Sequence, residues 1–186
     1  MTARLTLICH APTAATRAAR FPRDEAADDA ALTGTSALAI PAGSRTLAGP
    51  ERRTRETAAA LGRDPEIDAA LRDQDFGRWA GRALADLAAA EPDGLAAWMG
   101  DPEAAPHGGE SVAALLLRAE GWMADRAAAG GRVTAVTHPA VVRAAVSAAL
   151  GAGATALWRI EAPPLTVATL SHDGRRWTLV GLVPAP

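Results

Sequence analysis

Two histidines stand directly after short apolar runs of the chain. The run Arg4–Cys9 (RLTLIC) precedes His10, and the run Arg132–Thr137 (RVTAVT) precedes His138. Both runs have the length and the aliphatic content of buried strands. Ligands of α/β sheets bind beyond the carboxyl ends of the strands. The sequence therefore predicts that His10 and His138 lie at one edge of a sheet, where ligands bind. The alternative interpretation, from the histidines alone, is that each is a structural residue at a strand end.

A group of arginines lies in the helix that we expect at Glu51–Leu61. Pro50 precedes this helix, and proline favours the first turn of a helix. Unpaired N–H groups at a helix start and forked guanidinium groups both favour phosphate. We therefore interpret Arg53 as part of an anion site. The alternative interpretation is that Arg52, Arg53 and Arg55 form an ordinary solvated face.

Strands and helices alternate along most of the chain, which predicts a sheet covered by helices on both faces. The expected fold class is α/β, a three-layer α/β/α sandwich around a mostly parallel mixed sheet, with antiparallel strands near the C-terminus. Beyond the two histidine runs, the expected strands are Ser36–Ile40, Arg45–Ala48, Thr155–Ile160, Leu165–Ser171 and Trp177–Val183. The expected helices are Glu51–Leu61, Arg82–Ala90, Gly109–Ala129 and Ala140–Leu150. We expect Arg20–Thr35 to be an irregular polar loop and His172 to lie in a hairpin turn.

Length and composition restrict the class of protein. A chain of 186 residues with 49% hydrophobic residues is expected to form one domain, spanning residues 1–186. Its net charge of −2 and scattered arginines disfavour nucleic acid as a partner. The sequence has no signal peptide and no apolar run long enough for a membrane span, so we expect a cytoplasmic protein. The single cysteine, Cys9, excludes an internal disulfide and a cysteine-built zinc site.

Five segments, in this order along the chain, resemble motifs of the histidine phosphatase (phosphoglycerate mutase-like) superfamily. LICHAPT resembles the strand followed by Arg-His-Gly-x-Thr, and GPERRTRETA resembles the helix Ser-Pro-x-x-Arg-Thr-x-x-Thr-Ala. LRDQDFGRWAG resembles Leu-x-Glu-x-x-x-Gly-x-Trp-x-Gly. HGGES and VTAVTHPAVVRA resemble the Gly-Glu-Ser helix start and the Val-x-His-Gly segment. Together the segments cover about Leu5 to Ala145 and indicate the superfamily without indicating a substrate.

The resemblance implies a role for each matching residue. His10 would be the nucleophile that forms a phosphohistidine, Arg53 and His138 would hold the phosphoryl oxygens, and Asp73 would be the proton donor. These roles agree with general chemistry. An imidazole can attack phosphorus without a metal when a hydrogen bond fixes its tautomer. Nearby cations offset the charge of the transferring group, and a carboxylic acid can protonate the departing alkoxide.

Four further residues are candidate contacts of the substrate or of the site. Thr16 occupies a position where the superfamily often has a polar residue of the phosphate site. Arg17 and Arg20 follow on the same loop and are either substrate contacts or solvent-exposed loop residues. Glu110, at the Gly-Gly-Glu-Ser helix start, is either a supporting partner or a carboxylate favoured by the helix dipole.

The chain departs from the superfamily pattern at three positions. Cys9 stands where the pattern has the arginine beside the nucleophile, which removes a bidentate cation from the phosphate-binding set. Pro139 replaces the glycine after the second histidine and has no N–H to donate. Asp73 replaces glutamate and keeps the acid with a shorter reach. The pocket either binds phosphate less strongly or takes the missing charge from a neighbouring segment, for which Arg17, Arg20 and Arg52 are the candidates.

Three interpretations remain open. The first is a phosphatase that hydrolyses a small phosphorylated metabolite through His10, without a metal or cofactor. The second is a non-catalytic relative that binds an anion or a partner. The third is an enzyme with other chemistry in the same pocket, which includes Cys9 with a lowered thiol pKa. The alternative interpretation of Cys9, which we prefer, is a small buried residue that ends a strand. A metal hydrolase built from Cys9, His10, Asp73 and His138 is disfavoured because no ligand pair has helical metal-binding spacing. The sequence does not indicate an oligomeric state.

Overall fold

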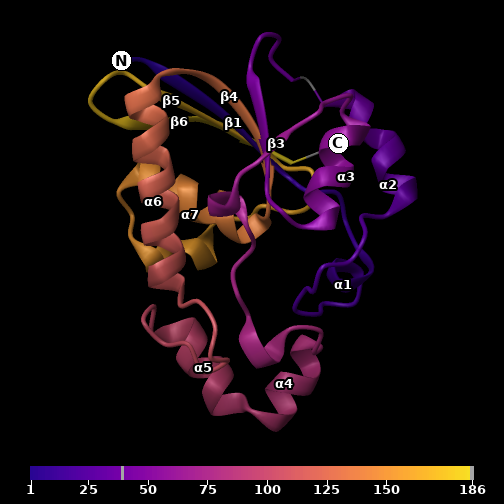
Figure 1. The fold of residues 1–186 in the computed structure, drawn as a ribbon. Coiled ribbons are helices and arrows are strands. Elements are labelled where there is room, and N and C mark those ends of the chain that lie inside the picture. The colour runs from indigo at the N-terminus through magenta and orange to yellow at the C-terminus, as the bar shows by residue number, and fades with distance from the viewer. Residues whose placement is uncertain (39, 185–186) are drawn as a thin grey trace.

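A computed structural model describes residues 1–38 and 40–184 of the chain. Its centre is a six-stranded sheet with the strand order β3-β2-β4-β1-β5-β6 (Figure 1). The strands are β1 (Ala3–Cys9), β2 (Arg45–Ala48), β3 (Glu66–Ile67), β4 (Gly131–Thr137), β5 (Val167–His172) and β6 (Trp177–Val183). The first four are parallel to one another, whereas β5 runs antiparallel to both β1 and β6. The prediction of a mostly parallel mixed sheet is therefore confirmed.

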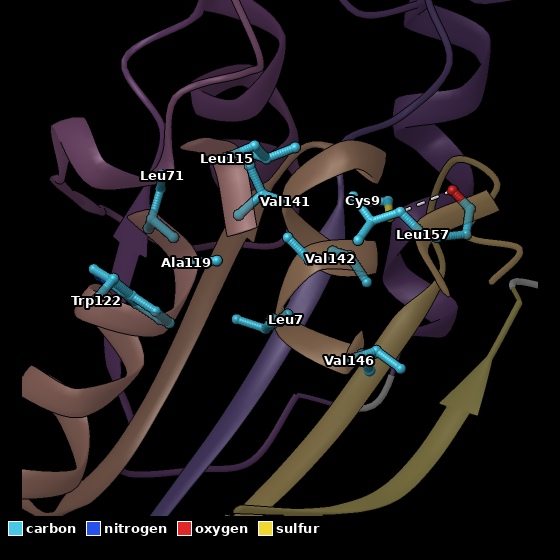
Figure 2. Packing of buried hydrophobic residues seen from close by; sticks show 14 of the residues in the cluster. Leu7, Cys9, Leu71, Leu115, Ala119, Trp122, Val141, Val142, Val146 and Leu157 are labelled. Carbon is cyan, nitrogen blue, oxygen red and sulfur yellow. Dashed lines mark hydrogen bonds between the residues drawn. The ribbon is translucent and has the colours of Figure 1, made fainter. Parts of the chain in front are cut away.

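Side chains of the central strand β1 point alternately to the two faces of the sheet. Leu7 packs in one apolar cluster with Leu115 of α6 (Val112–Ala129) and Val142 of α7 (Pro139–Leu150), as Figure 2 shows. Ile8, the next residue, packs in a second cluster with Ala58 of α3 (Arg52–Ala60) on the opposite face. Helices therefore cover both faces, which confirms the three-layer α/β/α sandwich.

The two long helices begin and end at residues with clear capping chemistry. Ser111 caps α6 by accepting a hydrogen bond from the Ala114 backbone N–H at 3.1 Å. The helix α7 starts directly after β4, with Pro139 in its first turn, where the missing N–H costs nothing. Its C-terminal cap is Gly151 at φ +61°, a left-handed conformation that favours glycine. This strand-to-helix connection fixes the direction of His138.

The remaining helices are short. They are α1 (Ala14–Arg17), α2 (Asp29–Thr33), α4 (Leu84–Ala90) and α5 (Pro92–Gly100), with 3₁₀ turns at Gly34–Ala37, Ala69–Leu71, Gly77–Trp79 and Ala154–Arg159. In Figure 1, α4 and α5 lie at the bottom, away from the sheet. Trp98 of α5 contacts the rings of Phe21, Trp79 and Trp158 at 5.6, 5.9 and 4.7 Å between centroids. This aromatic cluster ties α5 to the rest of the molecule.

Several sequence predictions about local structure are wrong. Ser36 and Ala37, expected in a strand, lie in a 3₁₀ turn, and residue 39 of that expected strand lies outside the described residues. The expected strand Thr155–Ile160 falls largely on the 3₁₀ turn Ala154–Arg159. Short apolar runs do not distinguish strands from helical turns, which explains both errors. The loop expected at Arg20–Thr35 contains α2.

Other elements were predicted with the right type. The strands β2 and β6 have the expected bounds, and the two histidine strands each begin one residue earlier than expected. The expected helices match α3, α4, α6 and α7 with shifts of up to three residues at their starts. His172 is the last residue of β5 rather than a turn residue. Within residues 1–38 and 40–184, no helix has the length and apolar character of a membrane span.

Candidate active site

His10 lies just beyond the end of β1 and is almost fully buried. Its backbone N–H donates to the Thr137 carbonyl at 2.8 Å, which continues the pairing of β1 with β4 and brings the rings of His10 and His138 to 5.1 Å. The His10 Nδ1 lies 2.7 Å from the carbonyl oxygen of Ala11, which can only accept, so Nδ1 carries the proton. Nε2 is therefore the nitrogen with a free electron pair.

The surroundings of His10 keep its ring neutral. Burial, and after it the charge of His138, lowers the His10 pKa to about 3. The Arg53 Nε donates to His10 Nε2 at 3.2 Å, which agrees with an unprotonated Nε2. A neutral imidazole with its electron pair on Nε2 is the nucleophilic form of the side chain.

Arg53 is buried at the start of α3, and each of its three guanidinium nitrogens has a partner within the protein. Nε contacts His10, and Nη1 donates to the Arg23 carbonyl at 2.6 Å. Nη2 donates to Asp73 Oδ2 at 2.7 Å and lies 3.2 Å from Nδ1 of His138. Only 1% of Arg53 is exposed, so the alternative of an ordinary solvated face is wrong for this residue.

His138, the N-terminal cap residue of α7, lies between two carboxylates. Its Nε2 is 2.8 Å from Glu51 Oε2, and its Nδ1 is 3.3 Å from Asp73 Oδ2. Burial opposes protonation of His138, but the two carboxylates outweigh it and raise the His138 pKa. The contact requires Gly49, because a Cβ there would lie 2.8 Å from the Leu71 carbonyl oxygen and 3.2 Å from His138 Nε2.

Asp73 lies on an irregular segment that follows the 3₁₀ turn Ala69–Leu71. Its backbone N–H donates to Glu51 Oε1 at 3.0 Å. Arg118 of α6 fixes the segment by donating to the carbonyls of Ala70 and Asp73 at 2.6 and 3.3 Å. Burial would raise the Asp73 pKa, but His138 and Arg53 outweigh it and hold the pKa below its usual range. Asp73 is therefore a carboxylate in this structure.

A cavity of about 150 Å³ opens onto His10 and Asp73. Its lining consists of His10, Thr13, Thr16, Arg20, Pro22, Asp73, Phe76, Pro139, Ala140 and Arg143. A second hollow of about 370 Å³ shares Pro22, Asp73 and Phe76 with it and reaches Arg53 and Arg72. A nitrogen with an electron pair and a carboxyl group thus line the cavity, and the side chains of Arg53 and His138 lie behind them within contact distance. Such a set of groups can act in phosphoryl transfer.

Comparison with known proteins agrees with this geometry. A model of the histidine phosphatase superfamily (branch 1) matches residues 5–183. The chain belongs to the histidine phosphatase superfamily. One of its relatives is the bifunctional protein Rv2228c of Mycobacterium tuberculosis. The two sequences are 31% identical over 137 residues, which is 69% of this chain and 37% of that protein. The chain thus spans little more than a third of that relative.

Other relatives of this superfamily member are named phosphatases. A glucosyl-3-phosphoglycerate phosphatase of Mycolicibacterium vanbaalenii is 34% identical over 115 residues, or 54% of this chain and 50% of that protein. The mycobacterial glucosyl-3-phosphoglycerate phosphatase Rv2419c, solved with VO3, has a TM-score of 0.85 at 25% identity, over 99% of this chain and 100% of that one. A putative alpha-ribazole-5'-P phosphatase from Escherichia coli has a TM-score of 0.85 at 21% identity, over 98% and 97% of the two chains.

Cys9 is fully buried and faces the apolar layer between the sheet and α7. Its thiol lies among Val142 and Leu157 and donates a weak hydrogen bond to the Ala162 carbonyl, with 3.7 Å between sulfur and oxygen (Figure 2). Burial raises the Cys9 pKa to about 12. The expectation of a lowered thiol pKa, on which the interpretation of other chemistry at Cys9 depended, is therefore wrong.

The candidate substrate contacts differ in their distance from the cavity. Thr16 and Arg20 line it, although the Thr16 hydroxyl also donates to the Thr13 carbonyl at 2.9 Å and Arg20 Nη1 donates to the Gly81 carbonyl at 3.3 Å. Arg17 is largely exposed and pairs with Asp28. Arg52 is exposed and pairs with Glu56. Neither Arg17 nor Arg52 lines the cavity, so the structure does not bring these two to His10.

Glu110 lies outside the cavity as a structural partner. Its carboxylate accepts from Arg118 at 2.7 and 2.8 Å and from Arg72 at 3.1 Å. His107 is buried against Trp79, with 5.1 Å between the ring centroids, and does not line the His10 cavity. Among the described residues, no group of three or more His, Cys, Asp or Glu side chains is placed to hold a metal ion.

Two residues of the site escaped the sequence analysis. Glu51 bonds both His138 and the Asp73 backbone, and its signal was its position two residues before Arg53 at the helix start. Arg143 lines the cavity from α7, and its signal was helical spacing: it lies one turn after Pro139, on the same helix face.

Proposed function

We propose that this protein is a phosphatase that hydrolyses a small phosphomonoester by a phosphohistidine mechanism on His10, without a metal. The observation that carries the proposal is the state of the His10 ring. The Ala11 carbonyl fixes the proton on Nδ1, and the low pKa leaves Nε2 unprotonated and directed at the cationic group of Arg53. Superfamily membership and the named phosphatases among its relatives support the same reaction class.

In the proposed first step, Nε2 of His10 attacks phosphorus and the bond to the leaving oxygen breaks. Arg53 and protonated His138 stabilise the charge on the phosphoryl oxygens. The leaving alkoxide takes a proton from Asp73. In the second step, Asp73 as a carboxylate accepts a proton from water, and the water oxygen attacks phosphorus. The bond between phosphorus and Nε2 breaks, inorganic phosphate leaves, and His10 returns to its starting form.

Asp73 must gain a proton before the first step, although its pKa in this structure lies below the usual range. A phosphate dianion supplies the reason for the change. Its oxygens compete for the cations that now face Asp73, those of Arg53 and His138. The dianion also adds negative charge beside the carboxyl group, which raises the Asp73 pKa. Of the acids considered from the sequence, only Asp73 contacts Arg53 and lines the His10 cavity.

The substrate that we propose is a small phosphorylated metabolite with a polar leaving group. The cavity of about 150 Å³ beside His10 accommodates a phosphoryl group. The adjoining hollow, which is lined by Arg23, Asp24, Arg72 and Gln74 among others, would hold the rest of the molecule. The relative from Mycolicibacterium vanbaalenii is named as a phosphatase of a phosphorylated small molecule, glucosyl-3-phosphoglycerate, which supports this substrate class.

The test is hydrolysis of para-nitrophenyl phosphate by the purified protein, with and without a chelator. We expect turnover that the chelator leaves unchanged. The His10→Ala variant should lose on the order of 10⁴-fold or more of the turnover, because the nucleophile is removed. The matched control is His172→Ala, which removes a histidine at the far end of β5 and should retain wild-type turnover. Turnover that chelation abolishes and added metal restores would contradict the proposal, as would an active His10→Ala protein.

A further inference from the structure

The cationic groups around His10 are largely neutralised within the protein. Arg53 pairs with Asp73, and His138 lies between Asp73 and Glu51. Two cations and two carboxylates therefore form a closed cluster on this side of the cavity. A phosphate dianion that enters the cavity must compete with these carboxylates for each donor, so the cluster alone offers little net attraction.

Arg143 is a cation of a different kind in the same cavity. It lies on α7, one turn after Pro139, and lines the cavity together with His10 and Asp73. Its Nε is buried and has no hydrogen-bond partner, and the side chain forms no ion pair with any residue of the described ranges. A buried guanidinium nitrogen without a partner is costly, so its presence beside a cavity indicates a ligand that completes it.

The position of Arg143 suits it to replace the cation that the superfamily pattern has at the position of Cys9. Arg143 and His10, the residue that follows Cys9, line the same cavity. Cys9 is the residue directly before the nucleophile, where the Arg-His-Gly pattern has an arginine. Because Cys9 is turned into the apolar layer, the first strand delivers no cation to the cavity. The neighbouring helix delivers one instead.

We propose that Arg143 binds the non-bridging oxygens of the phosphoryl group at His10 and supplies from α7 the cation that is absent at position 9. The proposal deepens the function proposed above and rests on it for the position of the phosphoryl group. Arg143 needs no rearrangement of Arg53 or Asp73 to act, because its guanidinium is not engaged elsewhere. The forked guanidinium can donate two parallel hydrogen bonds to phosphate oxygens.

The test measures binding of inorganic phosphate and of vanadate by isothermal titration calorimetry, which requires no turnover. We expect Arg143→Met to weaken binding of both anions by about 10- to 100-fold, since one charge-assisted contact is lost. Arg143→Lys, which keeps the charge and loses the fork, should bind with intermediate affinity. The matched control is Arg126→Met, because Arg126 also has a buried Nε without a partner but lies on α6 beside Trp122. This variant should bind like the wild type.

A second measurement needs no variant and covers the case in which Arg143→Met fails to fold. In the wild-type protein labelled with ¹⁵N-arginine, added phosphate should shift the Arg143 Nε–H resonance and leave that of Arg126 in place. An unshifted Arg143 resonance at saturating phosphate would overturn the proposal, as would wild-type affinity in folded Arg143→Met. If either result is found and the wild-type protein still hydrolyses phosphomonoesters, the phosphatase function stands and only the proposed role of Arg143 is contradicted. If anion binding depends on Arg143 but the protein has no turnover, the role of Arg143 in anion binding stands and the phosphatase function is contradicted.

Discussion

The two sides of the phosphate cavity differ in how their polar groups are engaged. On the α3 side, Arg53, Glu51 and Asp73 bond to one another through His138 or directly. On the α7 side, Pro139 has no N–H, and Arg143 has no hydrogen-bond or ion-pair partner among the described residues. The polar groups of the α3 side are thus held in place by one another before any substrate binds. On the α7 side, the guanidinium group of Arg143 is available to bind an anion. We infer from this comparison that the α3 side acts mainly in the chemical steps and that Arg143 on the α7 side adds to the first binding of phosphate.

Among tests of this difference between the two sides, the largest expected effect is the loss of phosphorylation rate on substitution of Asp73. The Asp73→Asn variant cannot protonate a leaving alkoxide, so phosphorylation of His10 by an alkyl phosphate should slow by about 10²- to 10⁴-fold. With an aryl phosphate, whose leaving group departs readily without a proton, the same step should slow much less. Single-turnover measurement of phosphohistidine formation separates this step from the attack of water. Equal losses with the two substrates would show that Asp73 is not the acid.

A smaller effect is expected at Glu51, which positions His138 and the Asp73 backbone without lining the His10 cavity. Glu51→Gln keeps a hydrogen bond to His138 but removes a negative charge that raises the His138 pKa. The His138 pKa should fall, so the activity that depends on protonated His138 should be lost at a lower pH than in the wild type. We expect kcat to fall by roughly tenfold at neutral pH, as for the loss of one charge-assisted contact. A pH–rate profile with an unmoved alkaline limb would reduce Glu51 to a structural role.

The neutral state of His10 predicts a pH dependence of stability. The folded protein holds the His10 pKa at about 3, whereas the unfolded chain protonates a histidine near its usual value of 6.5. The unfolded state therefore binds more protons below pH 6.5, and stability falls as the pH falls from 6.5 toward 3. His10→Gln lacks this contribution. Its free energy of unfolding, relative to the wild type, should improve by up to about 1.4 kcal/mol per pH unit between pH 6 and pH 4.

Urea unfolding of both proteins at several pH values measures this difference. His138 contributes in the opposite direction, because its raised pKa stabilises the fold below pH 6.5 and the contribution disappears as the pH rises through its folded value. This second histidine is present in both proteins, so the comparison isolates His10. Parallel pH curves for the two proteins would mean that His10 is protonated in the folded state.

The smallest effect on turnover is expected at Cys9, which the comparison assigns to the apolar layer rather than to the cavity. Cys9→Ala should keep turnover within about twofold and lower the free energy of unfolding by about 1 kcal/mol, since a small buried side chain is shortened. In the wild type, a thiol reagent should react with Cys9 only as fast as the protein opens, because the thiol is buried and its pKa is about 12. A loss of turnover in Cys9→Ala without a loss of stability would place Cys9 in the cavity.

The sequence predicted the parts of the site that follow from chain order. The two apolar runs gave the strands that end at His10 and His138, and the motifs indicated Arg53 and Asp73, which the fold brings together. The role of each residue stays a prediction. Arg143 could not be identified in this way, because its importance depends on which face of α7 meets the cavity. Whether an arginine has a partner is likewise decided by tertiary contacts, as Arg17 and Arg52 illustrate.

The position of β1 in the sheet has a consequence for the order of folding. The strand that ends at the proposed nucleophile pairs only with β4 and β5, whose residues follow it by more than 120 positions. Contacts so distant along the chain are costly in loop entropy and form slowly. During synthesis, His10 leaves the ribosome well before Val167–His172, so the sheet around it is complete only after that strand has emerged. The residue that we propose as the nucleophile therefore waits for a much later part of the chain before its site can form.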